Sequence, residues 1–248
     1  MDLERIVADL VEKIERRFYG KYRGIVVDNQ DPAKIGRLKL KVPSVLGSDV
    51  VTGWALPCSP YGGAADQGFL FIPDVGAGVW TEFEEGDLEF PIWAGTFWSQ
   101  PNGESELPKP NKAADGSEES GVQDPPTSKI VKTAKGHTLQ LEDADGAEMI
   151  LIREGSQGHF MTMDQNGITV TDASGNTVEF TPDGIKIEDT NHNTIEMTSS
   201  GIQMTDVTGN VIVMSDSEFT LTAKKALTID ATGQSVTVIG KTIDLQKA

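Results

Sequence analysis

Hydrophobic and polar residues alternate along the last third of the chain, in a pattern that repeats about every seventeen residues. Three segments at this spacing begin with Gly-Ile and end with Asp, at residues 167–172, 184–189 and 201–206. A second alternating segment lies inside each row, and rows near residues 218–222 and 235–238 continue the series. Alternation at every second residue predicts strands with one apolar face and one polar face.

Turn-forming residues separate these predicted strands, as in Ser174-Gly175-Asn176 and Thr208-Gly209-Asn210. Gly and Asn tolerate the positive φ that tight turns require. Each strand offers only two or three apolar side chains, which is too few to close a core in one copy, and soluble monomers rarely leave a long apolar stripe in water. We therefore predict that several copies, most simply three around a threefold axis, wind together into a needle.

The side chains that we predict to face the shared core of this trimer follow the apolar positions of the rows. They are Ile168, Val170, Val178, Phe180, Ile185, Ile187, Ile195, Met197, Ile202, Met204, Ile212, Met214, Phe219, Leu221, Val236 and Val238.

Two single-chain solenoids are alternatives to this trimer. A left-handed β-helix would place apolar residues near every sixth position, whereas the apolar pairs here are spaced alternately near ten and seven residues. A right-handed β-helix of the enzyme type needs longer coils with three inward faces. The spacing favours the intertwined trimer.

The start of the chain predicts an amphipathic helix over residues 1–20, with apolar residues at three- and four-residue steps. This helix either packs on its own domain or docks on a neighbouring subunit. The residues available for docking are Leu3, Ile6, Leu10 and Ile14.

Short strands separated by turns follow in residues 21–98 and indicate a small closed barrel. A stretch rich in Pro, Gly, Ser and Glu at residues 99–128 then predicts a linker or extended loop, and residues 129–248 form the needle. The expected fold is therefore all-β after the N-terminal helix. The barrel strands are expected at Tyr22–Val27, Arg37–Pro43, Trp54–Pro57, Gly68–Pro73, Gly78–Phe83 and Pro91–Gly95.

The chain is acidic, with a formal net charge of −17, of which about −11 falls in residues 136–248. Such a surface repels nucleic-acid phosphates and keeps a long β-structure soluble. The N-terminus does not read as a signal peptide and no apolar run reaches the length of a membrane span, so we expect synthesis in the cytoplasm. Cys58 is the only cysteine, and we expect a half-buried structural thiol there.

Four segments resemble the OB-fold domain of contractile-injection spike proteins. They are YRGIVVDNQDPAKIGRLKLKVPSV from Tyr22, GWALPCSPYGG from Gly53, GFLFIPDVGAGVWTEFEEGD from Gly68 and PIWAGTFW from Pro91. This group includes phage baseplate assembly protein V, the VgrG proteins of type VI secretion, and spikes of extracellular injection particles. The segment KTAKGHTLQLEDADGAEMILI from Lys132 resembles the first β-helix turns of the same spikes.

The resemblance implies a non-enzymatic, homotrimeric central spike of a phage tail-like particle, seated on the baseplate hub and inner tube. Such a spike punctures a target envelope and touches the target membrane only transiently. The last turns lack the His-x-His motif of some phage tips, which implies a separate PAAR-type tip protein. The residues expected to contact that tip protein are Ile239, Ile243 and Leu245. No cofactor is implied.

Other functions have weaker support in the sequence. Arg23, Arg37, Lys39 and Lys41 could form a cationic barrel face for an oligonucleotide, but the acidic balance and the lack of basic–aromatic interleaving oppose this. We interpret Trp54, Trp80, Trp93 and Trp98 as barrel core or interface anchors. A trimeric fibre or adhesin that binds a cell-surface receptor is the main alternative to the spike, although the monotonous rows carry no enlarged head domain.

The titratable residues predict no catalytic or metal site. His137 and His159 each follow a Gly at a turn, and His159 aligns by period with Asn176, so these histidines are expected to replace Asn in turns. A metal site on a threefold axis is disfavoured because a turn position points away from the axis. Glu84, Glu85, Asp87 and Glu89 crowd one turn, which we interpret as a solvated hairpin tip rather than a glycosidase pair.

Overall fold

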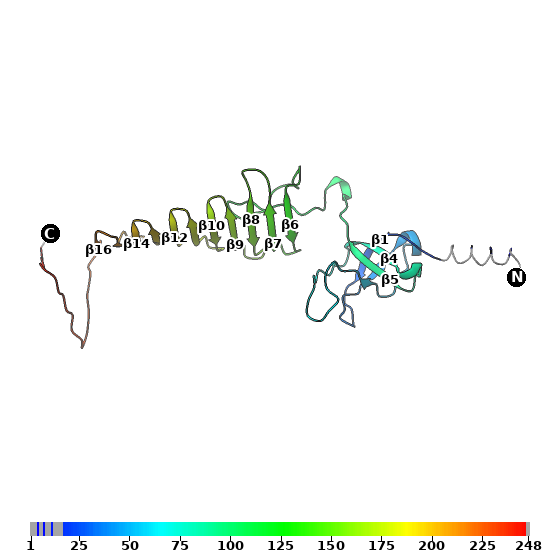
Figure 1. Cartoon of the computed structure of the whole chain (residues 1–248), viewed down its shortest axis with the longest axis horizontal. Coiled ribbons are helices and arrows are strands. Elements are labelled where there is room, and N and C mark those ends of the chain that lie inside the picture. Colours follow the sequence, from blue (N-terminus) through cyan, green and yellow to red (C-terminus); the bar gives the residue numbers. More distant parts are fainter. Residues whose placement is uncertain (1–3, 5–6, 8–10, 12–16, 247–248) are drawn as a thin grey trace. The chain divides into compact units, whose positions relative to one another are not determined.

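A computed structural model describes residues 4, 7, 11 and 17–246 of the chain (Figure 1). The chain divides into two compact units, Met1–Leu107 and Pro108–Ala248, and each is described by itself. The predicted docking residues Leu3, Ile6, Leu10 and Ile14 lie outside the described residues.

The first unit contains a five-stranded sheet with the strand order β2-β1-β4-β5-β3. Neighbouring strands are antiparallel except β3 and β5, which are parallel. The strands are β1 (Tyr22–Asp28), β2 (Lys39–Lys41), β3 (Leu56–Pro57), β4 (Gly78–Phe83) and β5 (Pro91–Thr96).

One face of this curled sheet forms the core of the first unit. Burial alternates along β4, where Val79, Thr81 and Phe83 point inward and the residues between them are partly exposed. Trp93 of β5 joins this core, and its indole Nε1 donates a hydrogen bond to the carbonyl oxygen of Gly36 at 3.0 Å. The alternation read from the sequence therefore becomes a half-barrel of the OB type, and the all-β expectation is confirmed.

The strand predicted at Gly68–Pro73 is not formed. The chain is an open loop there, and Phe69, Leu70 and Phe71 are 59%, 83% and 64% exposed. Glycines at 62, 63 and 68 adopt positive φ, which breaks the extended backbone that a strand needs. Cys58, at the start of this loop, is exposed rather than half-buried.

Glu4, Val7 and Val11 are helical, and the helices whose bounds the structure gives are short segments. They are α2 (Pro43–Leu46), η1 (Glu84–Gly86) and η2 (Pro101–Gly103). Among the described residues, no helix has both the length and the apolar character needed to cross a membrane. The acidic turn at η1 is solvated, with Glu84, Glu85 and Glu89 exposed.

The second unit contains an eleven-stranded antiparallel sheet in which every strand pairs with the next one along the chain (Figure 1). Its strands are β6 (Ser128–Lys132), β7 (Thr138–Glu142), β8 (Met149–Arg153), β9 (Phe160–Asp164), β10 (Gly167–Thr171), β11 (Thr177–Thr181), β12 (Gly184–Glu188), β13 (Thr194–Thr198), β14 (Gly201–Thr205), β15 (Val211–Met214) and β16 (Phe219–Thr222).

This sheet folds back and forth, so both single-chain solenoids are wrong for these residues. A solenoid coil would leave consecutive turns parallel, whereas every ladder from β6 to β16 is antiparallel and made within one chain. How three copies wrap around one another stays a prediction about the assembly.

Glycine is required where three of the strands begin after a two-residue turn. Gly167, Gly184 and Gly201 have φ of 137°, 146° and 131°. A Cβ atom at these positions would approach the carbonyl oxygen of the facing strand to 1.8–2.1 Å. The Gly that opens each seventeen-residue row is therefore dictated by backbone contact as well as by conformation.

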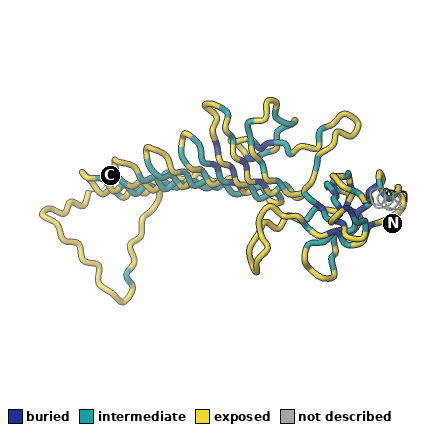
Figure 2. Tube along the Cα trace, turned by 45° about the vertical axis from the view of Figure 1, so that its right-hand side comes forward, coloured by how far each residue is buried: buried dark blue, intermediate teal, exposed yellow. Residues whose placement is uncertain are grey.

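The segment expected as a linker, residues 99–128, belongs partly to each unit. From Pro108 it packs on the outer face of β7–β9, where Met149, Leu151 and Phe160 are buried. The side chain of Gln140, 1% exposed, bonds both the N–H and the carbonyl oxygen of Asn111. Figure 2 shows burial concentrated in these first strands and lower burial toward β16.

Asp31 organises the turn between β1 and β2, because its carboxylate accepts hydrogen bonds from three backbone N–H groups and from the Arg37 guanidinium. We expect Asp31→Asn to lower the melting temperature of the purified protein by several degrees, since the amide cannot accept all five hydrogen bonds. Differential scanning calorimetry measures this, with Asp66→Asn in an exposed loop as the control. Equal melting of both variants would contradict this role of Asp31.

Candidate functional site

The most extensive candidate site is the apolar face of the second-unit sheet. Strand register aligns its side chains into two columns that run across neighbouring strands. The long-turn column comprises Val131, Leu139, Ile152, Met161, Val170, Val178, Ile187, Ile195, Met204, Ile212 and Leu221. The short-turn column comprises Leu141, Ile150, Met163, Ile168, Phe180, Ile185, Met197, Ile202, Met214 and Phe219.

Both columns are open in the single chain. Ile202 is 37% exposed, Val170 is 41% and Val131 is 47%, although side chains of this kind are normally buried. Two columns across eleven strands make a contiguous apolar area much larger than the few hundred Å² that monomers usually expose. The face therefore requires a partner surface of the same apolar character.

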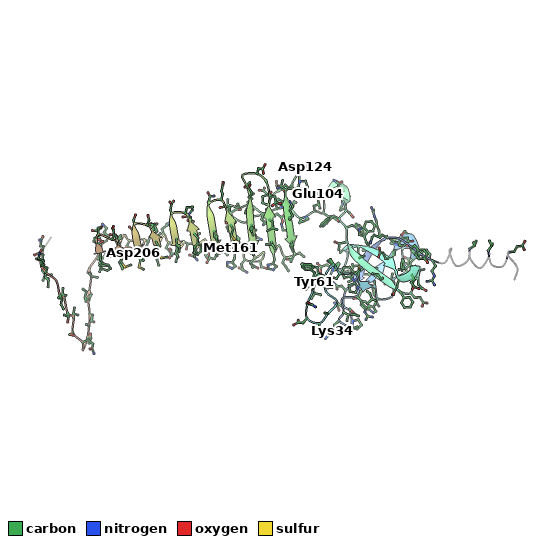
Figure 3. All side chains as sticks on the ribbon, viewed as in Figure 1. Lys34, Tyr61, Glu104, Asp124, Met161 and Asp206 are labelled. Carbon is green, nitrogen blue, oxygen red and sulfur yellow. The ribbon has the colours of Figure 1, made fainter. Side chains whose placement is uncertain are left out.

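The long-turn column lines a groove of about 710 Å³. Its floor is apolar, and one wall consists of turn residues that rise beside the sheet, including Asp172, Asp189 and Asp206. Met161 of the column and Asp206 of the wall are labelled in Figure 3. The face is therefore hollowed along one side, where a protruding apolar edge would fit.

A ladder of side-chain hydrogen bonds joins successive long turns. The Oδ1 of Asn176 accepts the N–H of Thr190 in the next turn at 3.1 Å. Asn193 accepts the N–H of Val207 and Asn210 that of Lys224, at 2.9 and 2.8 Å. Backbone groups that would otherwise face only water thus connect each turn to the next.

The long turns after β10, β12 and β14 are also braced internally by their first residue, an Asp. In one turn, Asp206 accepts backbone N–H groups through Oδ1 and the Asn210 amide through Oδ2 at 2.6 Å. The Asn210 amide and the Thr208 hydroxyl lower the pKa of Asp206 to about 2. The equivalent Asn hydrogen bonds hold the pKa of Asp172 and Asp189 below the usual range.

Two histidines take the place of Asn in this ladder, as their alignment by period predicted for His159. The Nδ1 of His159 accepts the N–H of Ala173 at 3.0 Å, and that of His137 accepts the N–H of Gly155 at 3.1 Å. His192 has a positive φ and lies 2.7 Å from Glu188. In the described residues, no three His, Cys, Asp or Glu side chains group to hold a metal.

The structure brings most of the predicted trimer-core residues together on this one face, from Ile168 to Leu221. Val236 and Val238 lie beyond β16, where the described chain has no strand, and Ile239, Ile243 and Leu245 are exposed there. The sequence reading missed the seven column residues that precede Ile168. They are Val131, Leu139, Leu141, Ile150, Ile152, Met161 and Met163. Alternation within β7 and β9 could have found four of them, whereas β6 and β8 carry apolar residues on both faces.

The first unit offers a smaller polar–aromatic surface. The Arg23 guanidinium lies 5.5 Å from the Phe97 ring centroid, and Lys39 Nζ lies 5.0 Å from that of Trp54. Arg37 is committed to Asp31 at 2.7 Å. Trp93 is in the core and Trp98 is 61% exposed. The cations are thus mostly paired with the domain's own aromatic and acidic groups.

Comparison with known families matches both units. Residues 22–98 match the type VI secretion system and phage-baseplate injector OB domain. Residues 129–191 match the phage baseplate V C-terminal trimerisation domain. No curated protein sequence matches the chain.

An injector OB domain followed by a trimerisation domain defines a spike-like protein of phage tails and related secretion systems. With both parts matched, the chain belongs to the phage baseplate V class of spike-like proteins. Its domains are of a structural, baseplate type, and the trimerisation domain indicates a homotrimer within a tail-like particle.

Removing one link of the turn ladder tests its contribution. We expect Asn193→Ala to lower the free energy of unfolding by about 1–2 kcal/mol, because Asp189 and the N–H of Val207 each lose a partner. Chemical denaturation monitored by circular dichroism measures the change. Asn191→Ala in the same turn removes no side-chain hydrogen bond of the ladder and should change the free energy much less; equal effects would argue against the ladder.

Acidity should weaken the same turns. The pKa of Asp206 is about 2 in the folded chain against an ordinary 3.8, so its contribution is complete above pH 3.8 and is lost as the pH falls toward 2. Thermal unfolding between pH 5 and pH 2 should show this fall. Asp206→Asn should show a smaller fall over that interval, and an identical pH profile would exclude Asp206 as a source.

Proposed function

We propose that this chain is the homotrimeric central spike of a contractile injection particle. Its second unit would form the shaft, and its first unit, with the N-terminal segment, would seat the trimer on the baseplate hub and inner tube. The observation that carries the proposal is the two-column apolar face, in a chain whose second unit matches a trimerisation domain.

The apolar face accounts for the shaft through hydrophobic burial. An Ile side chain that is about 40% exposed in the single chain would lose that area to the neighbouring copies, a gain of roughly 1.5–2 kcal/mol at about 25 cal/mol per Å². Summed over both columns, this gain offsets the entropy lost on association. Because the polar outer face keeps its solvent contacts, the assembly stays soluble.

The hydrogen-bond ladder suits a part that carries load along its length. Eleven strands at a spacing of about 4.8 Å make a sheet roughly 50 Å long. Every step along that length is tied by backbone ladders and, at the long turns, by side chains such as Asn176. Driven by contraction of the particle, such a shaft could puncture an envelope without unfolding.

The seating and the tip follow by analogy with the same class. In the first unit, exposed Tyr61, Phe69 and Phe71 form an aromatic surface of edge-on and tilted rings, with centroids 5.8 and 6.3 Å apart, that suits a protein contact in the baseplate. At the other end of the chain, Ile239, Ile243 and Leu245 would present apolar side chains to a PAAR-type tip protein.

A charge placed on the apolar face tests the trimer. We expect Ile202→Asp to abolish trimer formation, because three carboxylates would be buried in one dry layer. The mass in solution from light scattering coupled to gel filtration is the readout. Gln203→Asp places the same charge on the opposite face of the same strand and should leave the trimer intact. A stable Ile202→Asp trimer would show that this face is not the interface.

A further inference from the structure

The chain continues its apolar–polar alternation beyond the last strand of the sheet. After β16, three triplets place a polar residue between two apolar ones: Leu227-Thr228-Ile229, Val236-Thr237-Val238 and Ile243-Asp244-Leu245. All six apolar side chains are exposed, from 53% at Ile243 to 94% at Leu245. No strand is formed in this part of the described chain, which leaves the sheet after β16 (Figure 1).

The spacing of the triplets fits an antiparallel register that would extend both columns. If Thr222 faces Ala226 across a three-residue turn, Leu221 faces Leu227 and Phe219 faces Ile229. After the next turn, Val238 faces Leu227 and Val236 faces Ile229. After the turn that follows, Ile243 faces Val238 and Leu245 faces Val236. A slip of one residue would turn every apolar side chain outward, so this register is strongly favoured.

One turn in this segment already has the Asp–Thr hydrogen bonds that brace a long turn of the sheet. Asp230 Oδ1 accepts the N–H and the hydroxyl of Thr232 at 2.9 and 2.6 Å, as Asp206 does for Thr208. Gly233 has a φ of 75°, near the 85° of Gly209. The turn ladder also reaches past β16, because Asn210 accepts the N–H of Lys224.

We infer that residues 226–245 form three further strands of the sheet, and that they do so on assembly with two other copies of this chain. In one copy the added strands would bury neither apolar column, so the entropy cost of ordering them is not offset. In the trimer, each added strand contributes two apolar side chains to the shared core. This inference rests on the proposed trimer, and the partner is the same segment of the two other copies.

The outer face provides a test that leaves the core intact. In the inferred register, Thr220 faces Thr228 and Thr228 faces Thr237, with Cα atoms about 4.5–5.5 Å apart, within the range of a disulfide. We would introduce Thr220→Cys with Thr228→Cys, and separately Thr228→Cys with Thr237→Cys, in a Cys58→Ser background. Gln203→Cys with Val213→Cys, directly opposite in β14 and β15, is the positive control. Thr220→Cys with Thr237→Cys, two strands apart, is the negative control.

Mild oxidation of the full-length trimer, followed by thiol counting by mass spectrometry, should show near-complete bonding in both test pairs and the positive control, and little in the negative control. In the Ile202→Asp background, bonding of Thr228→Cys with Thr237→Cys should fall at least tenfold. A trimer that bonds only the positive control would overturn the added strands and leave the spike proposal standing. Equal bonding in the Ile202→Asp monomer would overturn the dependence on assembly, and a wild-type chain that is no trimer would overturn both proposals.

Discussion

The second unit depends on a separation between two kinds of interaction. All strand ladders from β6 to β16 are made within one chain, so the strands between these two edge strands pair on both sides without a partner. Burial of apolar side chains is incomplete in one copy, because the columns that include Val170 and Ile202 are exposed to solvent there. Hydrogen bonds therefore determine the fold of the single chain, and the hydrophobic effect favours its association with other copies.

The two ends of the sheet differ in how the outer face is covered. At β7–β9 both faces carry apolar residues, and the chain's own segment from Pro108 covers one of them over Leu151 and Phe160. Beyond β9 the outer face turns polar, with Thr169, Lys186 and Gln203 among its residues, and needs no cover. One copy is thus a two-layered structure at its first strands and a single layer later, which explains why burial declines along the sheet.

The sequence predicts this structure well only where apolar and polar residues alternate unambiguously along a strand. The strands from β10 to β14 have one apolar and one polar face, so their existence and inward residues could be read directly. In β8, Met149-Ile150-Leu151-Ile152 is apolar on both faces, and periodicity cannot say which pair faces the partner copies. Gly68–Pro73 is a short apolar run typical of a buried strand, but it forms no strand ladder, and only the fold decides this. The turn ladder could be anticipated from the period of His159 and Asn176, but its hydrogen bonds to the next turn required coordinates.

The glycine that opens each row has an evolutionary consequence. Because Gly167, Gly184 and Gly201 recur at the same point of the same register, these three rows start in equivalent surroundings. Duplication or loss of a whole row would change the length of the sheet while preserving both faces, whereas insertion of a single residue within a strand would invert the side chains that follow it in that strand. The length of the sheet can therefore change in steps of one row while the contacts between neighbouring rows stay the same.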